Sequence, residues 1–326
     1  MKKTTLIMGL AGQDGSYLAN FLLQKGYRVV GLCHSSDPKA LWRLDYFNIR
    51  SKVKLEIGDI TDAAHMEKII NAYKPDELYN LAGISSVARS WDRPVETFRV
   101  NALAVIGILD VLRRRSPQTH FFQASSAEIY GNVREVVNEK ISMFNPLHPY
   151  GTSKLAAHFA IKNFRDQYGL FAVNGILFNH ESPLREDYFV TKVIAQGVAR
   201  LVRGEVKKFR LGNINVSRDF GFVGDFVEAM WSTLNHTRAE DFVICTGKSF
   251  TVRDFIREAF ACIDIADWQK YIEIDSLLVR KQEVKKMRGT SAKIKKELDW
   301  RPTISFKTLV KMMVEHEINT LQHGGI

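Results

Sequence analysis

The stretch TTLIMGLAGQDGSYLANFLLQK, residues 4–25, decides the fold of this chain. It opens with the apolar run Thr4–Met8, which is typical of a β-strand, and it closes with Ser16–Lys25, which has the composition of a helix. The segment Gly9–Gly15 between them carries glycine at its first, fourth and seventh positions. A strand, a glycine turn and a helix in this order predict the first unit of a parallel βαβ sheet.

The glycine turn also predicts a ligand. Glycines let the backbone turn tightly and approach a bound anion, and the start of the next helix offers free N–H groups and a positive dipole end. On the first βα turn of a sheet, this arrangement is typical of a site for the pyrophosphate of a dinucleotide. We therefore expect the cofactor to contact Gly9, Gly12, Gln13, Asp14 and Gly15.

Short apolar strands and helical stretches alternate along the rest of the chain, which predicts an α/β fold with a Rossmann-type, doubly wound parallel sheet. Further strands are expected at 27–33, 54–57, 77–80, 120–123 and 172–178, and a long amphipathic helix at Thr97–Arg113. Residues 1–175, with a returning segment near 213–238, are expected to form a dinucleotide-binding domain. Residues 176–212 and 239–326, with a short strand at Phe242–Cys245, are expected to form a smaller C-terminal α/β lobe that binds the substrate.

The end of the second strand should select the cofactor, since an acidic residue there binds the ribose of NAD and an arginine accepts the 2′-phosphate of NADP. The chain has Cys33-His34-Ser35-Ser36-Asp37 there, which satisfies neither rule. His34, Ser36 and the later Arg43 suit a phosphate, which slightly favours NADP over NAD. A loop without any phosphate contact is nearly as compatible with this stretch.

Residues that follow the third and fourth strands are further candidates for cofactor contact. Asp59 and Ile60 end the third strand and are expected near the adenine, although Asp59 is equally suited to cap a helix that begins near Thr61. After the fourth strand, small residues would let the backbone lie along the cofactor. The expected contacts there are Leu81, Ala82 and Ser85, and Ser85 is also expected to reach the substrate.

The candidate catalytic residues lie in residues 121–154, which read FFQASSAEIYG, then a polar loop, then HPYGTSK. Tyr150 and Lys154 are about one helical turn apart and therefore share a face. An ammonium so close should lower the pKa of the phenol from about 10 toward neutral, so that it can take a proton from a sugar hydroxyl. Ser126 and Glu128 follow the fifth strand and should lie beside them, although Glu128 is also suited to a structural role at a helix start.

Composition limits the remaining possibilities. The 326 residues are 45% hydrophobic and 25% charged, and no apolar run approaches the roughly 20 residues of a membrane span. The net charge of +10 is scattered and accompanies no nucleic-acid recognition motif, so we expect an anionic small molecule rather than nucleic acid. Three cysteines without paired spacing predict a reduced, cytoplasmic protein with no disulfide framework and no metal site.

Four stretches carry a resemblance to a known family: Gly12–Leu18 (GQDGSYL), Gln123–Ser125 (QAS), Asn174–Pro183 (NGILFNHESP) and Asp225–Trp231 (DFVEAMW). In these the chain resembles the extended short-chain dehydrogenase/reductases, and most closely the GDP-mannose 4,6-dehydratase family. The resemblance implies a tightly bound NADP, with NAD possible, and a GDP-sugar substrate. It also implies cofactor contacts at His180 and Arg185, and substrate contacts at Asn179, Lys192, Arg218, Arg280 and Glu283.

The resemblance implies roles for the candidate catalytic residues. Tyr150 would deprotonate the sugar 4-hydroxyl while hydride leaves C4, with Lys154 tuning the phenol and holding the nicotinamide ribose. Ser126 would donate a hydrogen bond to O4. Glu128 would remove the C5 proton and then protonate the departing C6 hydroxyl, after which hydride returns to C6. Ala127 stands where the family usually has serine, so Glu128 would act as both base and acid.

Other departures from the family pattern concern the ligands. His34-Ser35 replaces a pair of arginines, which weakens the prediction of NADP. Arg280–Val284 lacks the usual proline, so a related sugar such as a GDP-heptose is an alternative substrate. An NAD(P)-dependent 4-keto reductase or 4-epimerase would use the same scaffold without needing Glu128 for elimination. A cofactor-sensing protein without turnover would need none of these groups. Relatives are commonly homodimers or homotetramers, and the helix at Thr97–Arg113 is suited to pairing across a two-fold axis.

Overall fold

The structure is a computed structural model, and it describes residues 2–133, 135–140, 143–279, 284 and 286–322. A seven-stranded parallel sheet forms its centre, in the order β11-β6-β5-β4-β1-β2-β3. The strands are β1 (Thr4–Met8), β2 (Arg28–Cys33), β3 (Lys54–Ile57), β4 (Glu77–Asn80), β5 (His120–Ser126), β6 (Ala172–Leu177) and β11 (Phe242–Ile244). The order reverses between β1 and β4, and ligands of such sheets bind at that reversal. The predicted fold class is confirmed.

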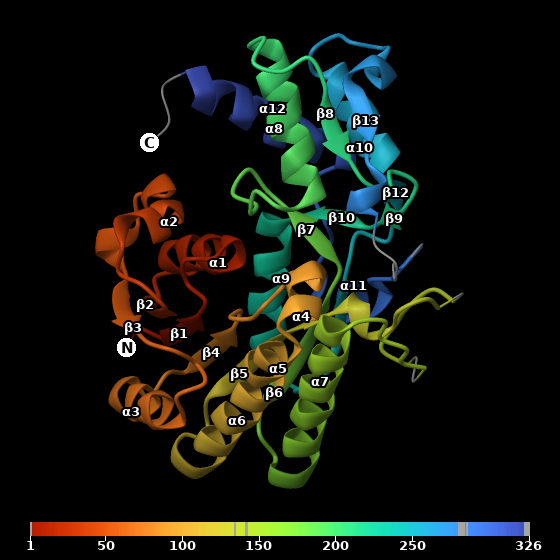
Figure 1. The fold of residues 1–326 in the computed structure, drawn as a ribbon. Coiled ribbons are helices and arrows are strands. Elements are labelled where there is room, and N and C mark those ends of the chain that lie inside the picture. The colour runs from red at the N-terminus through yellow and green to blue at the C-terminus, as the bar shows by residue number, and fades with distance from the viewer. Residues whose placement is uncertain (1, 134, 141–142, 280–283, 285, 323–326) are drawn as a thin grey trace.

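Helices cover both faces of the sheet (Figure 1). Because side chains alternate along a strand, Ile7 of β1 packs in a hydrophobic cluster on one face of the sheet, while Leu6 and Met8 pack in a cluster on the other face. One face carries α1 (Gln13–Gln24), α9 (Val223–Leu234) and α11 (Ala292–Leu298), with α2 (Trp42–Tyr46) beside α1. The other carries α3 (Ala63–Tyr73), α6 (Ala104–Arg115) and α7 (Pro149–Tyr168), together with the short α4 (Val87–Asp92) and α5 (Pro94–Phe98).

A separate hydrophobic core holds together the lobe that lies above the carboxyl ends of the strands (Figure 1). It packs α8 (Val190–Val202), α10 (Val252–Ala261) and α12 (Phe306–Gln322) against one another. Three two-stranded pairs complete it: β7 (Asn179–Glu181) with β10 (Phe220–Phe222), β8 (Phe209–Leu211) with β13 (Ile272–Ile274), and β9 (Ser217–Arg218) with β12 (Phe250–Thr251). The lobe and the sheet therefore face each other across the ends of β1, β4 and β5.

The structure changes two of the predicted elements. The strand at 242–244 was expected in the lobe, but β11 pairs with β6 and extends the main sheet, because its three residues are apolar and fully buried there. The helix expected at Thr97–Arg113 is interrupted by a π-helical turn at Arg99–Leu103, between α5 and α6. β9 and β10 lie in the lobe, although 213–238 was expected to return to the dinucleotide-binding domain, and α11 covers the sheet, although 239–326 was expected in the lobe. For the rest of these ranges, we propose that the expected division into a dinucleotide-binding domain and a lobe holds.

Every helix in the described part of the chain is too short or too polar to pass through a bilayer.

Candidate active site

The glycine turn fits closely against the loop that follows β4. Gly9 has a φ of +80°, and a Cβ atom there would lie 2.9 Å from the backbone nitrogen of Ala82. A Cβ at Gly15 would lie 2.2 Å from the carbonyl oxygen of Gly9, so side chains at these positions would break the turn. Gly12 is the N-cap of α1, and no side chain caps that helix start. The uncapped helix start and the tight turn fit the diphosphate of a dinucleotide.

Side chains of the glycine turn are bound to the segment after β6. Gln13 Nε2 donates to the carbonyl of His180 at 3.3 Å and to Asp14 Oδ1 at 3.1 Å, and Ser182 Oγ donates to Gln13 Oε1 at 2.8 Å. His180 Nε2 lies 2.9 Å from Asp14 Oδ2, and its Nδ1 lies 2.8 Å from the carbonyl oxygen of Phe178. This network joins two sequence stretches that are more than 160 residues apart, since Gln13 and Ser182 are separated by 169 positions.

The catalytic candidates meet where β5 ends and α7 begins. Ser126 ends β5, and its Oγ accepts a hydrogen bond from Glu128 N at 3.2 Å, which caps the short 3₁₀ turn Ala127–Ile129. The carboxylate of Glu128 lies 3.1 Å from Nε2 of His148, which is the N-cap of α7. Tyr150 lies in the first turn of that helix, and its phenol is hydrogen-bonded to Ser126.

The pKa of Tyr150 departs from the sequence prediction. Burial raises the pKa of Tyr150 to about 12, and the hydrogen bond from Ser126 only partly opposes this. The predicted lowering by Lys154 is wrong for this structure, because the Lys154 ammonium donates to the carbonyl of Ala124 at 2.8 Å and lies 5.9 Å from the centre of the phenol ring. Burial also lowers the pKa of Lys154 to about 8, with the nearby charge of Asp14 opposing it.

Several charged groups act on the phenol from separate parts of the chain. Glu128, Arg185 and Asp14 each contribute to the pKa of Tyr150, and Asp14 also contributes to that of Lys154. The glycine turn, the end of β5, the start of α7 and the segment after β7 therefore converge on one site. This is the place that the parallel topology assigns to ligands, beyond the carboxyl ends of the strands.

Asn101 belongs to the site and was missed by the sequence analysis. It lies in the π-helical turn, is 1% exposed, and exchanges hydrogen bonds with both backbone groups of Ile84, at 2.9 Å and 3.0 Å. Its amide also donates to Ser153 Oγ at 3.2 Å, next to Lys154. Such turns often occur at functional sites. A polar asparagine inside the apolar face of a predicted helix is the signal that points to it.

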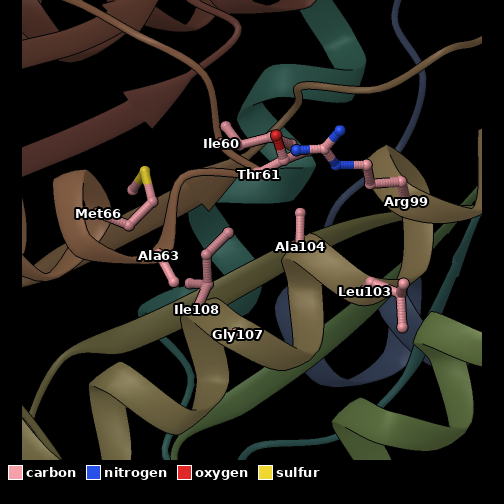
Figure 2. A pocket seen from close by; sticks show the side chains of 9 residues that line it. All are labelled: Ile60, Thr61, Ala63, Met66, Arg99, Leu103, Ala104, Gly107 and Ile108. Carbon is pink, nitrogen blue, oxygen red and sulfur yellow. The ribbon is translucent and has the colours of Figure 1, made fainter. Parts of the chain in front are cut away.

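A second part of the site lies at the edge formed by β2 and β3. Asp59 is exposed and accepts a hydrogen bond from Thr61 N at 2.8 Å, while the start of α3 is capped by Asp62 rather than by Asp59. Partial burial raises the pKa of the Asp59 carboxyl, but the hydrogen bonds from Thr61 and the effects of His34 and Arg99 outweigh it, so the pKa of Asp59 is lowered. Beside it, a pocket of about 230 Å³ opens between α3 and α6 (Figure 2). Its lining includes Ile60 and Arg99.

Cations predicted to bind ligands already have partners within the protein. Arg43 lies beside the glycine turn and binds the carbonyls of Ala11 and Leu184 and the carboxylate of Glu186. Arg185 Nε lies 3.1 Å from Glu181 Oε2. These partners hold both guanidinium groups near the site. The contacts of Arg43 and Arg185 with a ligand stay predictions.

Of the predicted substrate contacts that the structure describes, Asn179, Lys192 and Arg218 lie in the lobe, whereas Ser85 and Ser126 follow or end strands of the main sheet. Asn179 is half-buried at the start of β7, and Ser85 is exposed in the loop after β4. Lys192 is buried on α8, where it pairs with Glu317 and donates to the carbonyl of Pro183 at 2.8 Å. Arg218 donates to the carbonyl of Val284 at 2.6 Å. Arg280 and Glu283 lie outside the described residues.

Within the described ranges, no group of three or more histidine, cysteine, aspartate or glutamate side chains is arranged to hold a metal ion.

Comparisons with known proteins agree with this geometry. The profile of the family described as GDP-mannose 4,6 dehydratase matches residues 6–313. The chain is 40% identical to GDP-mannose 4,6 dehydratase 1 of Arabidopsis thaliana, over 97% of this chain and 90% of the relative. It is 35% identical to GDP-mannose 4,6-dehydratase of Vibrio cholerae, over 100% and 96% of the two chains.

Solved structures share the fold. The dTDP-glucose 4,6-dehydratase of Bacillus anthracis, in complex with NAD, superimposes with a TM-score of 0.85 at 19% identity, over 98% of each chain. The UDP-glucose 4-epimerase of Thermotoga maritima, with UDP-glucose, superimposes with a TM-score of 0.84 at 24% identity, over 98% of this chain and 99% of that one. The matched range and the identity to the relatives place the chain in a single family: it belongs to the GDP-mannose 4,6-dehydratases.

Proposed function

We propose that this protein is a nucleotide-sugar 4,6-dehydratase that converts GDP-mannose, or a related GDP-hexose or GDP-heptose, to the 4-keto-6-deoxy sugar with loss of one water. The observation that carries the proposal is the meeting of Glu128 with Ser126 and Tyr150 at the start of α7. The elimination step needs a carboxylate beside the phenol, and a simple redox reaction at C4 does not. The names of the relatives support the same substrate.

We propose that the cofactor is NADP, with NAD as the alternative, and that it is held tightly. The glycine turn and the uncapped start of α1 would hold the diphosphate, and Asp59 and Ile60 would face the adenine. Lys154 would hold the nicotinamide ribose. The charge of Arg99 helps to lower the pKa of Asp59, which supports positive charge near the adenosine and therefore a 2′-phosphate. When bound, a nicotinamide would supply a reversible hydride acceptor, which the side chains of the protein lack.

Tyr150 would take the proton from the 4-hydroxyl, and Ser126 would donate a hydrogen bond to O4. Because burial raises the pKa of Tyr150 to about 12, this use as a base requires more positive charge near the phenol than Lys154 supplies from its place at the Ala124 carbonyl. Glu128 would then remove the C5 proton, which the 4-ketone acidifies, and pass it to the C6 oxygen as that oxygen leaves as water. The proton from C5 and the C6 hydroxyl together make up the water that is lost. As hydride returns to C6, C5 must take up one proton, and the proton that Tyr150 took from the 4-hydroxyl balances it.

The test is an incubation of the purified protein with GDP-mannose, followed by mass spectrometry of the sugar nucleotide. We expect a product lighter by one water, without net consumption of cofactor. Net consumption of a reduced cofactor with a 4-keto sugar would instead select a reductase, and interconversion of C4 epimers would select an epimerase. Parallel incubations with UDP-, CDP- and dTDP-sugars identify the base, and mass spectrometry of co-purifying ligands identifies the cofactor.

We propose a homodimer, or a tetramer built from it, in the reducing cytoplasm, where the three free cysteines would remain thiols. Large exposed apolar side chains lie on the neighbouring helices α4 to α7: Trp91, Val95, Leu103, Ile106 and Phe159. Leu103 ends the π-helical turn and is 62% exposed. Sedimentation of Leu103→Glu should show a smaller species. Leu277→Glu, at an exposed lobe position, is the matched control and should sediment like the unchanged protein.

A further inference from the structure

His148 connects Glu128 to the helix that carries Tyr150. It is 4% exposed and is the N-cap of α7. Its Nδ1 accepts a hydrogen bond from Gly151 N at 3.0 Å, and its Nε2 lies 3.1 Å from Glu128 Oε2. Its ring lies nearly parallel to that of Tyr150, with centroids 5.9 Å apart and 21° between the planes. One imidazole therefore contacts the helix start and the carboxylate, and it lies stacked beside the phenol ring.

The helix cap fixes where the imidazole carries its proton. An Nδ1 that accepts from a backbone N–H has no hydrogen of its own, so in a neutral ring the hydrogen is on Nε2. That Nε2–H points to the carboxylate of Glu128 and donates to it. A proton added at Nδ1 would remove the cap at Gly151, so the ring is not suited to accept the proton that Glu128 takes.

The backbone of the same turn is held just as closely. A Cβ at Gly151 would lie 2.8 Å from the carbonyl oxygen of Glu128, so only glycine lets the turn after β5 pack on the first turn of α7. The Glu128 side chain is only 18% exposed, so the surrounding protein restricts its movement in addition to its bond with His148. The carboxylate and the phenol are thus positioned from one helix start.

We propose that His148 is a positioning residue for the elimination step: its Nε2–H holds the Glu128 carboxylate in place relative to Tyr150. This inference rests on the proposed function. With Ala127 beside it, Glu128 must act first on C5 and then on the C6 oxygen. The proton moves from C5 to Glu128 and then to the leaving hydroxyl, which departs as water. His148 gains and loses no proton, and it keeps one carboxylate oxygen hydrogen-bonded through both transfers.

Two variants separate the hold on Glu128 from the helix cap. His148→Ser keeps a good N-cap but loses the donor to Glu128, whereas His148→Ala loses both. We expect kcat for water loss to fall about 10- to 100-fold in both variants, the scale of a hydrogen bond to a charged group, with little change in KM. Only His148→Ala should also lose several degrees in melting temperature. A serine variant that recovers both the melting temperature and kcat would overturn the proposal.

A second readout isolates the proton transfer. With the 4-keto-6-deoxy product in deuterated water, we expect exchange of the C5 hydrogen to slow in His148→Ser by the same factor as kcat. Unchanged C5 exchange in His148→Ser would overturn the proposal.

A third readout does not depend on turnover. Nitrogen-15 spectra of the histidine rings should show His148 with hydrogen on Nε2 and none on Nδ1, and Glu128→Gln should shift the Nε2 signal. A His148 ring with its hydrogen on Nδ1 instead would contradict the hydrogen bond from Nε2 to Glu128 and overturn the proposal. If the unchanged protein dehydrates no nucleotide sugar, the proposed function fails, while these spectra still decide the His148–Glu128 contact.

Discussion

His180 Nε2 and Asp14 Oδ2 lie 2.9 Å apart, in a part-buried pair that joins the glycine turn to the segment after β6. Both ring nitrogens of His180 face acceptors, since Nδ1 lies 2.8 Å from the Phe178 carbonyl, so the ring carries both hydrogens. Burial opposes this charge, but Asp14 outweighs it and raises the pKa of His180. Burial likewise opposes the Asp14 charge, and His180 outweighs it and lowers the pKa of Asp14 to about 2.

The pair should make stability depend on pH. The contribution of His180 is complete below its unfolded pKa of about 6.5 and is lost as pH rises through its higher folded pKa. The contribution of Asp14 is present above about pH 4 and is lost as pH falls toward 2. We expect His180→Asn to lower the free energy of unfolding by on the order of 2 kcal/mol at about pH 5, and by less at about pH 9.

Denaturant unfolding of His180→Asn and of the unchanged protein, from about pH 5 to about pH 9, measures the difference in their free energies of unfolding. His34→Asn, at an exposed position, is the matched control and should leave the free energy of unfolding nearly unchanged. A difference between His180→Asn and the unchanged protein that does not vary with pH would contradict the charged pair.

Glu128→Gln should separate oxidation at C4 from the loss of water. The amide keeps the shape of the carboxylate but cannot accept the C5 proton. The 4-keto hexose should therefore form only up to one equivalent of the bound cofactor, because the hydride cannot return to C6 without the loss of water. Water loss should fall about 10²- to 10⁴-fold, the scale of general base catalysis. Mass spectrometry distinguishes the two sugar nucleotides. Full product formation by this variant would show that another group removes the proton.

Tyr150→Phe should lower kcat about 10²- to 10⁴-fold, because it removes the group proposed to take the 4-hydroxyl proton. In the free protein the phenol should ionise only at about pH 12, which ultraviolet difference titration of the variant against the unchanged protein measures. Tyr168→Phe, at an exposed position, is the matched control for activity. Ionisation of Tyr150 near neutral pH in the free protein would contradict the burial argument.

Lys154 should lose its proton at about pH 8 in the folded protein, because burial lowers its pKa. The unfolded chain then binds more protons than the folded one between about pH 8 and 10.5, so this group makes stability rise with pH in that window. Lys154→Met should abolish that part of the rise, whereas the exposed Lys162→Met should retain it. Equal pH dependence of the free energy of unfolding in the two variants would contradict the lowered pKa.

Asn101→Ala should loosen the loop after β4. It removes three hydrogen bonds of a buried amide and leaves the backbone groups of Ile84 without those partners. We expect a loss of about 2–4 kcal/mol in the free energy of unfolding. Amide hydrogen exchange at Ile84 should become faster than in the unchanged protein. Unchanged exchange at that amide would mean that the loop is held by other contacts.

The sequence by itself determined the fold class and the chemical groups of the site. The run Thr4–Met8, the glycines after it and the helix that follows are local features, so their structure could be predicted from neighbouring residues alone. Tyr150 and Lys154 share a helix, and Ser126 and Glu128 share the end of one strand, so each pair is also fixed by local geometry.

Only the tertiary structure decided how these groups are tuned. The pKa of Tyr150 depends on burial, and the place of the Lys154 ammonium depends on the Ala124 carbonyl of a neighbouring strand, neither of which helical spacing reveals. The pairing of β11 with β6 and the contact of His148 with Glu128 join residues that are far apart in the chain or separated by a loop. Such contacts form because packing the sheet buries both partners together, and no local pattern records which partners will meet.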